Sequence, residues 1–290
     1  MADFKESVRK AARAALADFV GFAGRERFEG MDAVKNPFNL FPEAKTVVVI
    51  GRRITRGTLR GIEEGVNFGD YGSFGQGWLA NEFVAETLYE TATAIERMGW
   101  EAMPLTPGLH TGVAGVSGPC DPDFNYCAVA AGLGEIGMSG EVLTPRFGPR
   151  QRFAIIVTDA ECESDPLLEK PVCTKCGRCA AICPLNALGP EITDINVAGK
   201  HMPVYTCNIR ACAKCQNGAA KAGYMETVMY GAVRETVEGI DRKAAVCTRT
   251  CVAALEDVVE NKLDLKFRQR EVWRKNEFGE ILPPVPADEA

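Results

Sequence analysis

The stretch "CTKCGRCAAICP", residues 173–184, places four cysteines close together and ends on a proline. The cysteines are Cys173, Cys176, Cys179 and Cys183. The first three thiols lie within seven residues of chain and cannot spread apart, so they are expected to converge on one bound group. The whole chain has 12 cysteines and only two histidines. In a chain without a secretory signal, this density of thiols favours metal binding over disulfides.

The spacing C-x2-C-x2-C-x3-C-P is typical of bacterial ferredoxin segments that bind [4Fe–4S] clusters. In such a segment the first three thiolates bind one cluster, and the fourth ligates a second cluster. The proline that follows stiffens the exit of the run. We therefore assign Cys173, Cys176 and Cys179 to a first cluster and Cys183 to a second.

Further cysteines downstream can complete both predicted clusters. Cys207, Cys212 and Cys215 are assigned with Cys183 to the second cluster. Position 219, where a second run of the same spacing would place the remaining thiol, is alanine. The segment "CTRTC" offers two substitutes for the first cluster. Cys251 is favoured and Cys247 is the alternative.

Zinc is the competing interpretation of these cysteines. Two four-cysteine zinc sites would use the same number of thiolates, but zinc sites normally pair two C-x2-C units and need no third cysteine at this spacing. Iron–sulfur clusters are therefore favoured. Cys120, Cys127 and Cys162 have no ligand spacing, and we expect them to be buried packing residues.

The rest of the chain predicts an α+β architecture. Among its 290 residues, 46% are hydrophobic and 25% are charged, which is typical of a soluble globular protein. Hydrophobic patterning predicts helices over residues 5–20 and 79–98 and buried strands over 46–51 and 152–159. We expect an α/β domain over residues 1–165, a cysteine-rich cluster domain over 166–261, and a tail over 262–290.

Charge and hydropathy limit the kinds of partner that the chain is expected to have. The net charge is −6 and the pI is about 5.3, without the basic footprint that a nucleic-acid groove needs. No apolar run reaches the length that spans a membrane. The N-terminal stretch lacks a secretory core and a twin-arginine signal, so we expect a cytoplasmic protein without nucleic-acid or membrane partners.

The stretch "GLGEIG", residues 132–137, matches the glycine fingerprint of dinucleotide-binding folds. That fingerprint must follow a strand and open a helix. Here Gly140, Pro145, Gly148 and Pro149 follow at once, which leaves no room for such a helix. The dinucleotide interpretation is therefore disfavoured, and a structural glycine turn is the simpler alternative.

The longer stretch "AAGLGEIGMSGEVLTPRFGPRQRFAIIVTD", followed shortly by the cysteine run, resembles the catalytic core of corrinoid-dependent reductive dehalogenases and of the related epoxyqueuosine reductases. The segments "ADFVGFAGRERF" and "PEAKTVVVIG" also look like the N-terminal core of that family. The resemblance implies a nitroreductase-like α/β core, followed by a ferredoxin-like domain with two [4Fe–4S] clusters. It also implies a cobalamin that the clusters reduce. The positions implied to contact the cobalamin are Gly132, Gly134, Gly137, Gly140, Thr144, Arg150 and Arg152.

The family also uses an acid to protonate its substrate, which is a tyrosine in dehalogenases and an aspartate in epoxyqueuosine reductases. In this chain "CDPDFNYC" offers Asp121, Asp123 and Tyr126 as candidates. Tyr126 is equally compatible with a core tyrosine whose hydroxyl is satisfied. The two aspartates flank a proline and are also compatible with a solvated turn. We expect both His110 and His201 on the surface or in loops.

These observations predict an iron–sulfur oxidoreductase. The main hypothesis is a cobalamin-dependent reductase of a small organic substrate, supplied by a low-potential donor such as a ferredoxin or flavodoxin. Met138 stands where epoxyqueuosine reductases carry a lysine, and the acidic charge disfavours tRNA as substrate. The alternatives are a corrinoid-free [4Fe–4S] electron-transfer subunit and an activator that reduces the corrinoid of a partner enzyme.

Overall fold

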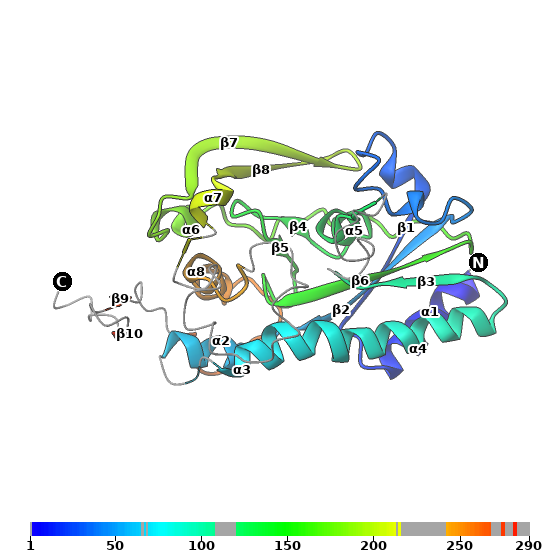
Figure 1. Cartoon of the computed structure of the whole chain (residues 1–290), viewed down its shortest axis with the longest axis horizontal. Coiled ribbons are helices and arrows are strands. Elements are labelled where there is room, and N and C mark those ends of the chain that lie inside the picture. Colours follow the sequence, from blue (N-terminus) through cyan, green and yellow to red (C-terminus); the bar gives the residue numbers. More distant parts are fainter. Residues whose placement is uncertain are drawn as a thin grey trace.

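The computed structural model describes residues 2–64, 67, 69–107, 120–212, 214–215, 242–267, 274–275 and 281–282. A four-stranded antiparallel sheet in the order β1-β2-β6-β3 forms its centre (Figure 1). Its strands are β1 (Phe19–Gly24), β2 (Thr46–Arg53), β3 (Ala102–Leu105) and β6 (Gln151–Thr158). The two predicted strands are thus confirmed as the central pair, β2 and β6, which align from Thr46↔Thr158 to Arg53↔Gln151.

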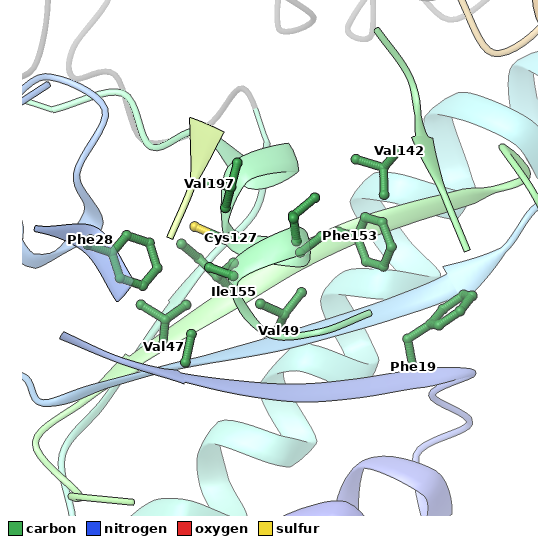
Figure 2. Packing of buried hydrophobic residues seen from close by; sticks show 14 of the residues in the cluster. Phe19, Phe28, Val47, Val49, Cys127, Val142, Phe153, Ile155 and Val197 are labelled. Carbon is green, nitrogen blue, oxygen red and sulfur yellow. The ribbon is translucent and has the colours of Figure 1, made fainter. Parts of the chain in front are cut away.

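Alternating side chains of the sheet build two hydrophobic cores. Val48 and Ile50 pack with α1 (Ala2–Ala14) and α4 (Ala85–Arg97) on one face. Val47 and Val49 pack on the other face with α5 (Phe124–Ala130). Figure 2 shows this second core around Phe153, Ile155 and Cys127. Burying each aliphatic side chain stabilises the fold by about 1.5–3 kcal/mol, which is why a strand that is apolar on both sides lies at the centre.

The first helix ends earlier than its hydrophobic pattern predicts. It stops at Ala14, and Leu16 takes a left-handed conformation with φ 67° and is 70% exposed. Phe19, which the pattern placed on the helix, begins β1 and is buried beside Phe153. Pairing with β2 outweighs helix propensity there, because each residue of β1 has a partner in that strand.

The predicted helix over 79–98 is one part of a continuous helical stretch, residues 69–97. The stretch begins with α3 (Gly69–Tyr71), passes through two π-helical segments at Gly72–Gln76 and Leu79–Val84, and ends in α4. Arg152 Nε donates to the Gly75 carbonyl at 2.9 Å within the first π segment. Gly99, with φ 90°, follows the helix end.

The cysteine-bearing part has its helices at the left of Figure 1, at the opposite end of the view from α1. Its elements are α6 (Arg178–Ala181), the antiparallel hairpin β7 (Leu188–Val197) and β8 (Lys200–Cys207), α7 (Ile209–Cys212) and α8 (Val246–Leu255). The remaining elements are α2 (Arg56–Glu63), the short pairs β4 (Glu135–Ile136) with β5 (Val142–Leu143) and β9 (Arg274–Lys275) with β10 (Ile281–Leu282), and 3-10 turns at Arg25–Phe28 and Pro37–Asn39.

Contacts of the core cross the predicted domain limits. Ala244, Val252 and Phe267 belong to the same hydrophobic cluster as Val8 and Ile50. The residues of the predicted cluster domain and tail therefore pack directly on the sheet domain, although the division at residues 165 and 261 stays a prediction. Within the described part of the chain, no helix is both long and apolar enough to cross a bilayer.

Candidate metal centres

Four cysteines from two distant segments surround one small cavity. Cys173, Cys176 and Cys179 approach it from the run before and within α6, and Cys251 approaches it from α8. Met138, Leu143 and Leu255 are among the apolar residues that complete its walls. The tertiary structure thus brings together the four thiols that the sequence assigned to the first cluster.

A second cavity is also lined by four cysteines. These are Cys183, Cys212, Cys215 and Cys247. Cys207 does not line it, but the Cys207 side chain shares a hydrogen bond with Cys212. The sequence had offered Cys247 as an alternative ligand of the first cluster, whereas the structure places it at the second cavity.

Burial raises the pKa of four of the thiols that line the two cavities. Burial raises the pKa of Cys179 to about 11 and the pKa of Cys212 to about 12, with neighbouring cysteines adding to both shifts. It also raises the pKa of Cys247 to about 12 and raises the pKa of Cys251 strongly. A buried thiolate needs a compensating charge, and a bound metal supplies one and deprotonates its ligands.

The donor set fits two iron–sulfur clusters. Each cavity offers four thiols, which is the ligand number of a [4Fe–4S] cluster. Among the described residues, no three or more His, Cys, Asp or Glu side chains are grouped so that they could hold a metal ion. The two cavities are therefore defined by the cysteines that line them.

Glu135 holds the start of the cysteine run. Its side chain is buried, and its Oε1 accepts hydrogen bonds from Val172 N–H at 2.8 Å and Cys173 N–H at 2.7 Å. Lys200 Nζ lies 3.6 Å from the other carboxylate oxygen. This role of Glu135 was not predicted from the sequence. The available signal was a charged residue inside an otherwise apolar glycine stretch.

The glycine stretch packs on the first cavity. Gly137 would place a Cβ 2.5 Å from the Leu143 side chain and 3.6 Å from Cys173 Sγ. Met138 N–H donates to Cys173 Sγ at 3.5 Å. Gly140 has φ 80°, and a Cβ there would lie 3.1 Å from Arg242 Nη2. These glycines bring the backbone close to the cysteine-bearing segment and to Arg242.

The other two glycines named for cobalamin face the protein's own backbone. A Cβ at Gly132, which has φ 73°, would lie 2.2 Å from the Pro166 carbonyl oxygen. A Cβ at Gly134 would lie 2.4 Å from the Leu143 carbonyl oxygen. The helix α5, and not a strand, precedes this stretch, so the dinucleotide fingerprint has no structural context here.

The polar residues named for cobalamin are also engaged within the protein. Thr144 is fully buried, and its hydroxyl lies 3.2 Å from Gln151 Oε1. Arg150 donates to the Ile54 carbonyl at 2.8 Å, and burial, assisted by neighbouring arginines, lowers its pKa to about 10. Arg152 bonds to the Gly75 carbonyl and donates to the Tyr71 hydroxyl at 3.0 Å.

The candidate proton donors have structural partners. Tyr126 donates from its hydroxyl to the Arg27 carbonyl at 2.9 Å and accepts from Ala198 N–H at 3.4 Å. Burial raises the pKa of this phenol. Asp123 caps α5 by accepting from two backbone N–H groups, and Asp121 pairs with Lys35 at 2.8 Å. These contacts favour the structural interpretations that the sequence left open.

The remaining residues considered from the sequence do not line either cavity where the structure describes them. His201 is exposed and lies 2.5 Å from Asp194, and His110 lies outside the described residues. Cys120, Cys127 and Cys162 are buried as expected. Cys127 and Cys162 each belong to one of the two main hydrophobic cores.

Among the described residues, the positions named for cobalamin contact other parts of the protein. Protein atoms fill the space that each of the four glycines leaves open, and the three polar side chains bond to groups of the protein. The thiol cavities fit their predicted cofactor through their donor set, whereas the contacts described at the seven positions named for cobalamin are all contacts within the protein.

Comparisons with known proteins agree with the resemblance seen in the sequence. No protein-family model matches the chain. Tetrachloroethene reductive dehalogenases of Desulfitobacterium hafniense and Dehalobacter restrictus are each 36% identical to it over 111 residues. A tetrachloroethene reductive dehalogenase of Sulfurospirillum multivorans is 32% identical over 102 residues. The segment matched in the first two makes up 37% of this chain and 18% of each relative.

Solved structures extend the likeness to the whole fold. A catabolic reductive dehalogenase superimposes with a TM-score of 0.57 at 20% identity, covering 98% of this chain and 41% of its own. Another reductive dehalogenase structure, described as suggesting a mechanism for B12-dependent dehalogenation, has a TM-score of 0.56 at 20% identity and covers 97% and 42%. Epoxyqueuosine reductase from Streptococcus thermophilus has a TM-score of 0.51 at 16% identity and covers 90% and 68%. The chain spans less than half the length of these dehalogenases. It shares their mixed α/β fold, and it shares a stretch of sequence with the tetrachloroethene reductive dehalogenases. Both findings agree with the resemblance to the reductive dehalogenase and epoxyqueuosine reductase family.

Proposed function

We propose that the chain is an iron–sulfur oxidoreductase that holds two [4Fe–4S] clusters and passes electrons between them. The observation that carries this proposal is the pair of cavities, each lined by four cysteines. Such clusters transfer one electron at a time at potentials set by charge, hydrogen bonds and solvent exposure. The likeness to reductases supports a role within a reductive reaction.

The protein supplies position and charge to the two sites. Glu135 fixes the backbone at the first cysteine, and Met138 donates a hydrogen bond to its sulfur. Arg242 lines the second cavity and is held by Glu141 at 3.3 Å and by the Ser139 carbonyl at 2.8 Å. A largely buried cation at this point would favour the reduced, more negative state of an anionic cluster held in the cavity. Cys176 is exposed, so the first site is within reach of an external donor.

The substrate of the reduction is a separate proposal. A small organic molecule reduced with cobalamin remains the second candidate, because a solved neighbour at a TM-score of 0.56 is described in terms of B12-dependent dehalogenation. The seven positions expected to hold the corrin have partners in the protein, which favours the corrinoid-free alternative for the described residues. We propose a low-potential ferredoxin or flavodoxin as the electron donor.

Oxygen-free purification, followed by iron, sulfide and zinc analysis, tests the proposal. We expect about eight irons per chain and the EPR spectrum of reduced [4Fe–4S] clusters. Zinc without iron would overturn it. Adding cob(II)alamin then separates the two candidates. A base-off EPR signal that appears only with protein supports the cobalamin-dependent reductase, and an unchanged cobalamin spectrum supports the corrinoid-free electron carrier.

A further inference from the structure

The helix α8 carries two cysteines that face different cavities. Cys251 lines the first cavity, and Cys247 lines the second. Residues four apart on a helix lie on the same face, about 6 Å apart along the axis. One turn of α8 therefore presents a thiol to each cavity.

The turn at α6 has the same arrangement. Cys179 lines the first cavity, and Cys183, four residues later, lines the second. The two helices pack against each other. Each cavity thus receives one thiol from α6 or the residues just after it, and one thiol from α8. This pairing is expected when each of two helical turns lies between two neighbouring clusters.

The sequence spacing repeats this pattern with an interruption. The first run is C-x2-C-x2-C-x3-C, from Cys173 to Cys183. The second half of the chain contains C-x2-C at Cys212 and Cys215, and then C-x3-C at Cys247 and Cys251. The second set therefore matches the first, with residues 216–246 standing where the first run has two residues. Cys207 has no counterpart in the matched pattern.

We propose that Cys247, and not Cys207, is the fourth ligand of the second cluster, so that α8 ligates both clusters. This inference rests on the proposed function. It replaces the assignment of Cys207 from sequence, because Cys207 lies outside the wall of the second cavity while Cys247 forms part of it. Cys207 instead shares a hydrogen bond with the ligand Cys212.

The surroundings of Cys247 suit a ligand. Its side chain is 9% exposed, and Arg242 lies in the same cavity wall. Arg242 also interacts electrostatically with Cys247, Cys207 and Cys212, so it lies close to all three thiols. A guanidinium at this point can offset the negative charge of a cluster held by four thiolates.

Two serine variants of the full chain test the assignment, with iron content and the EPR spectrum as readouts. In Cys247→Ser we expect iron to fall from about eight to about four per chain. The interaction between two reduced clusters should disappear from the spectrum as well. In Cys207→Ser we expect about eight irons and a two-cluster spectrum. Cys183→Ser serves as the reference for loss of the second cluster, and Cys127→Ala is the control for removing a buried thiol elsewhere.

The proposal is overturned if Cys207→Ser loses about half of the iron, or if Cys247→Ser keeps all of it. If Cys247→Ser cannot be purified, Cys207→Ser alone decides, because a full complement of iron without Cys207 leaves Cys247 as the remaining thiol at that cavity among the described residues. Absence of iron from the wild-type protein would instead overturn the proposed function, so the two failures are distinguishable.

Discussion

A buried ion pair fixes the helix that carries Cys247 and Cys251, and its removal should weaken both sites. Arg249 lies between the two cysteines on α8 and is 0% exposed, and Glu63 on α2 is 1% exposed. Arg249 Nε lies 2.5 Å from Glu63 Oε2. We expect Glu63→Gln to destabilise the fold by about 3–5 kcal/mol, because it removes the buried carboxylate that offsets the charge of Arg249.

The size of this loss of stability follows from the burial of both side chains, and it corresponds to a shift in the midpoint of thermal unfolding. At about 2–4 °C per kcal/mol, the midpoint of thermal unfolding should fall by roughly 6–20 °C. Glu161→Gln is the matched control, since Glu161 forms a pair with Lys45 at 3.0 Å in which both side chains are more than half exposed. An exposed pair contributes about 0–1 kcal/mol, so the control should barely shift the midpoint.

Differential scanning fluorimetry under nitrogen measures both variants, and release of iron to a chelator reports on the sites. We expect Glu63→Gln to lose iron faster than the wild type, because α8 supplies a thiol to each cavity. The reasoning is refuted if Glu63→Gln and Glu161→Gln shift the midpoint equally. Replacing both partners of the buried pair by apolar residues should leave the stability nearly unchanged. This comparison separates the effect of the remaining buried charge from the effect of lost packing.

Four further substitutions test other contacts. Glu135→Gln removes the carboxylate charge that accepts hydrogen bonds from two backbone N–H groups. It should lower the free energy of unfolding by roughly 1.5–3 kcal/mol and speed the loss of iron from the first cluster. Chelation kinetics equal to those of the wild type would contradict this prediction. Gly132→Ala would put a Cβ 2.2 Å from a backbone oxygen at φ 73°, so its urea midpoint should fall well below that of Gly30→Ala, where φ is 74° and nothing lies within 4 Å. Equal midpoints for the two glycine variants would show that the close approach costs nothing. Tyr126→Phe loses a satisfied hydroxyl and should cost about 1–3 kcal/mol in urea unfolding with unchanged iron content; a drop in iron at unchanged stability would point to a role at the clusters. For Glu141, burial opposes ionisation but two neighbouring cations outweigh it and hold the pKa below its usual 4.5. The wild type should therefore exceed Glu141→Gln in stability at neutral pH, and that advantage should vanish as the pH falls through the lowered pKa, whereas a constant difference across the titration would exclude the carboxylate charge as its source.

Local patterns in the sequence were sufficient for several elements. The apolar runs within the predicted strands 46–51 and 152–159 form the two central strands, because a strand buried on both faces is apolar along its length. The spacing of Cys173, Cys176 and Cys179 places their thiols around one cavity, because so few residues separate them. The glycine after α4 ends that helix because it reaches a positive φ without strain.

Other features depend on contacts between distant segments. The sequence alone favoured Cys251 over Cys247 for one site. Packing of α8 against α6, together with the Arg249–Glu63 ion pair to α2, directs each cysteine to a different cavity. Phe19 shows the same limit, since its predicted place on a helix yields to strand pairing with Gly51. Glu135 gained its role only when Val172 and Cys173 folded back onto it. Spacing along the chain determines geometry within a turn or a strand, whereas the partner of a side chain many residues away is decided by how whole elements bury their apolar faces.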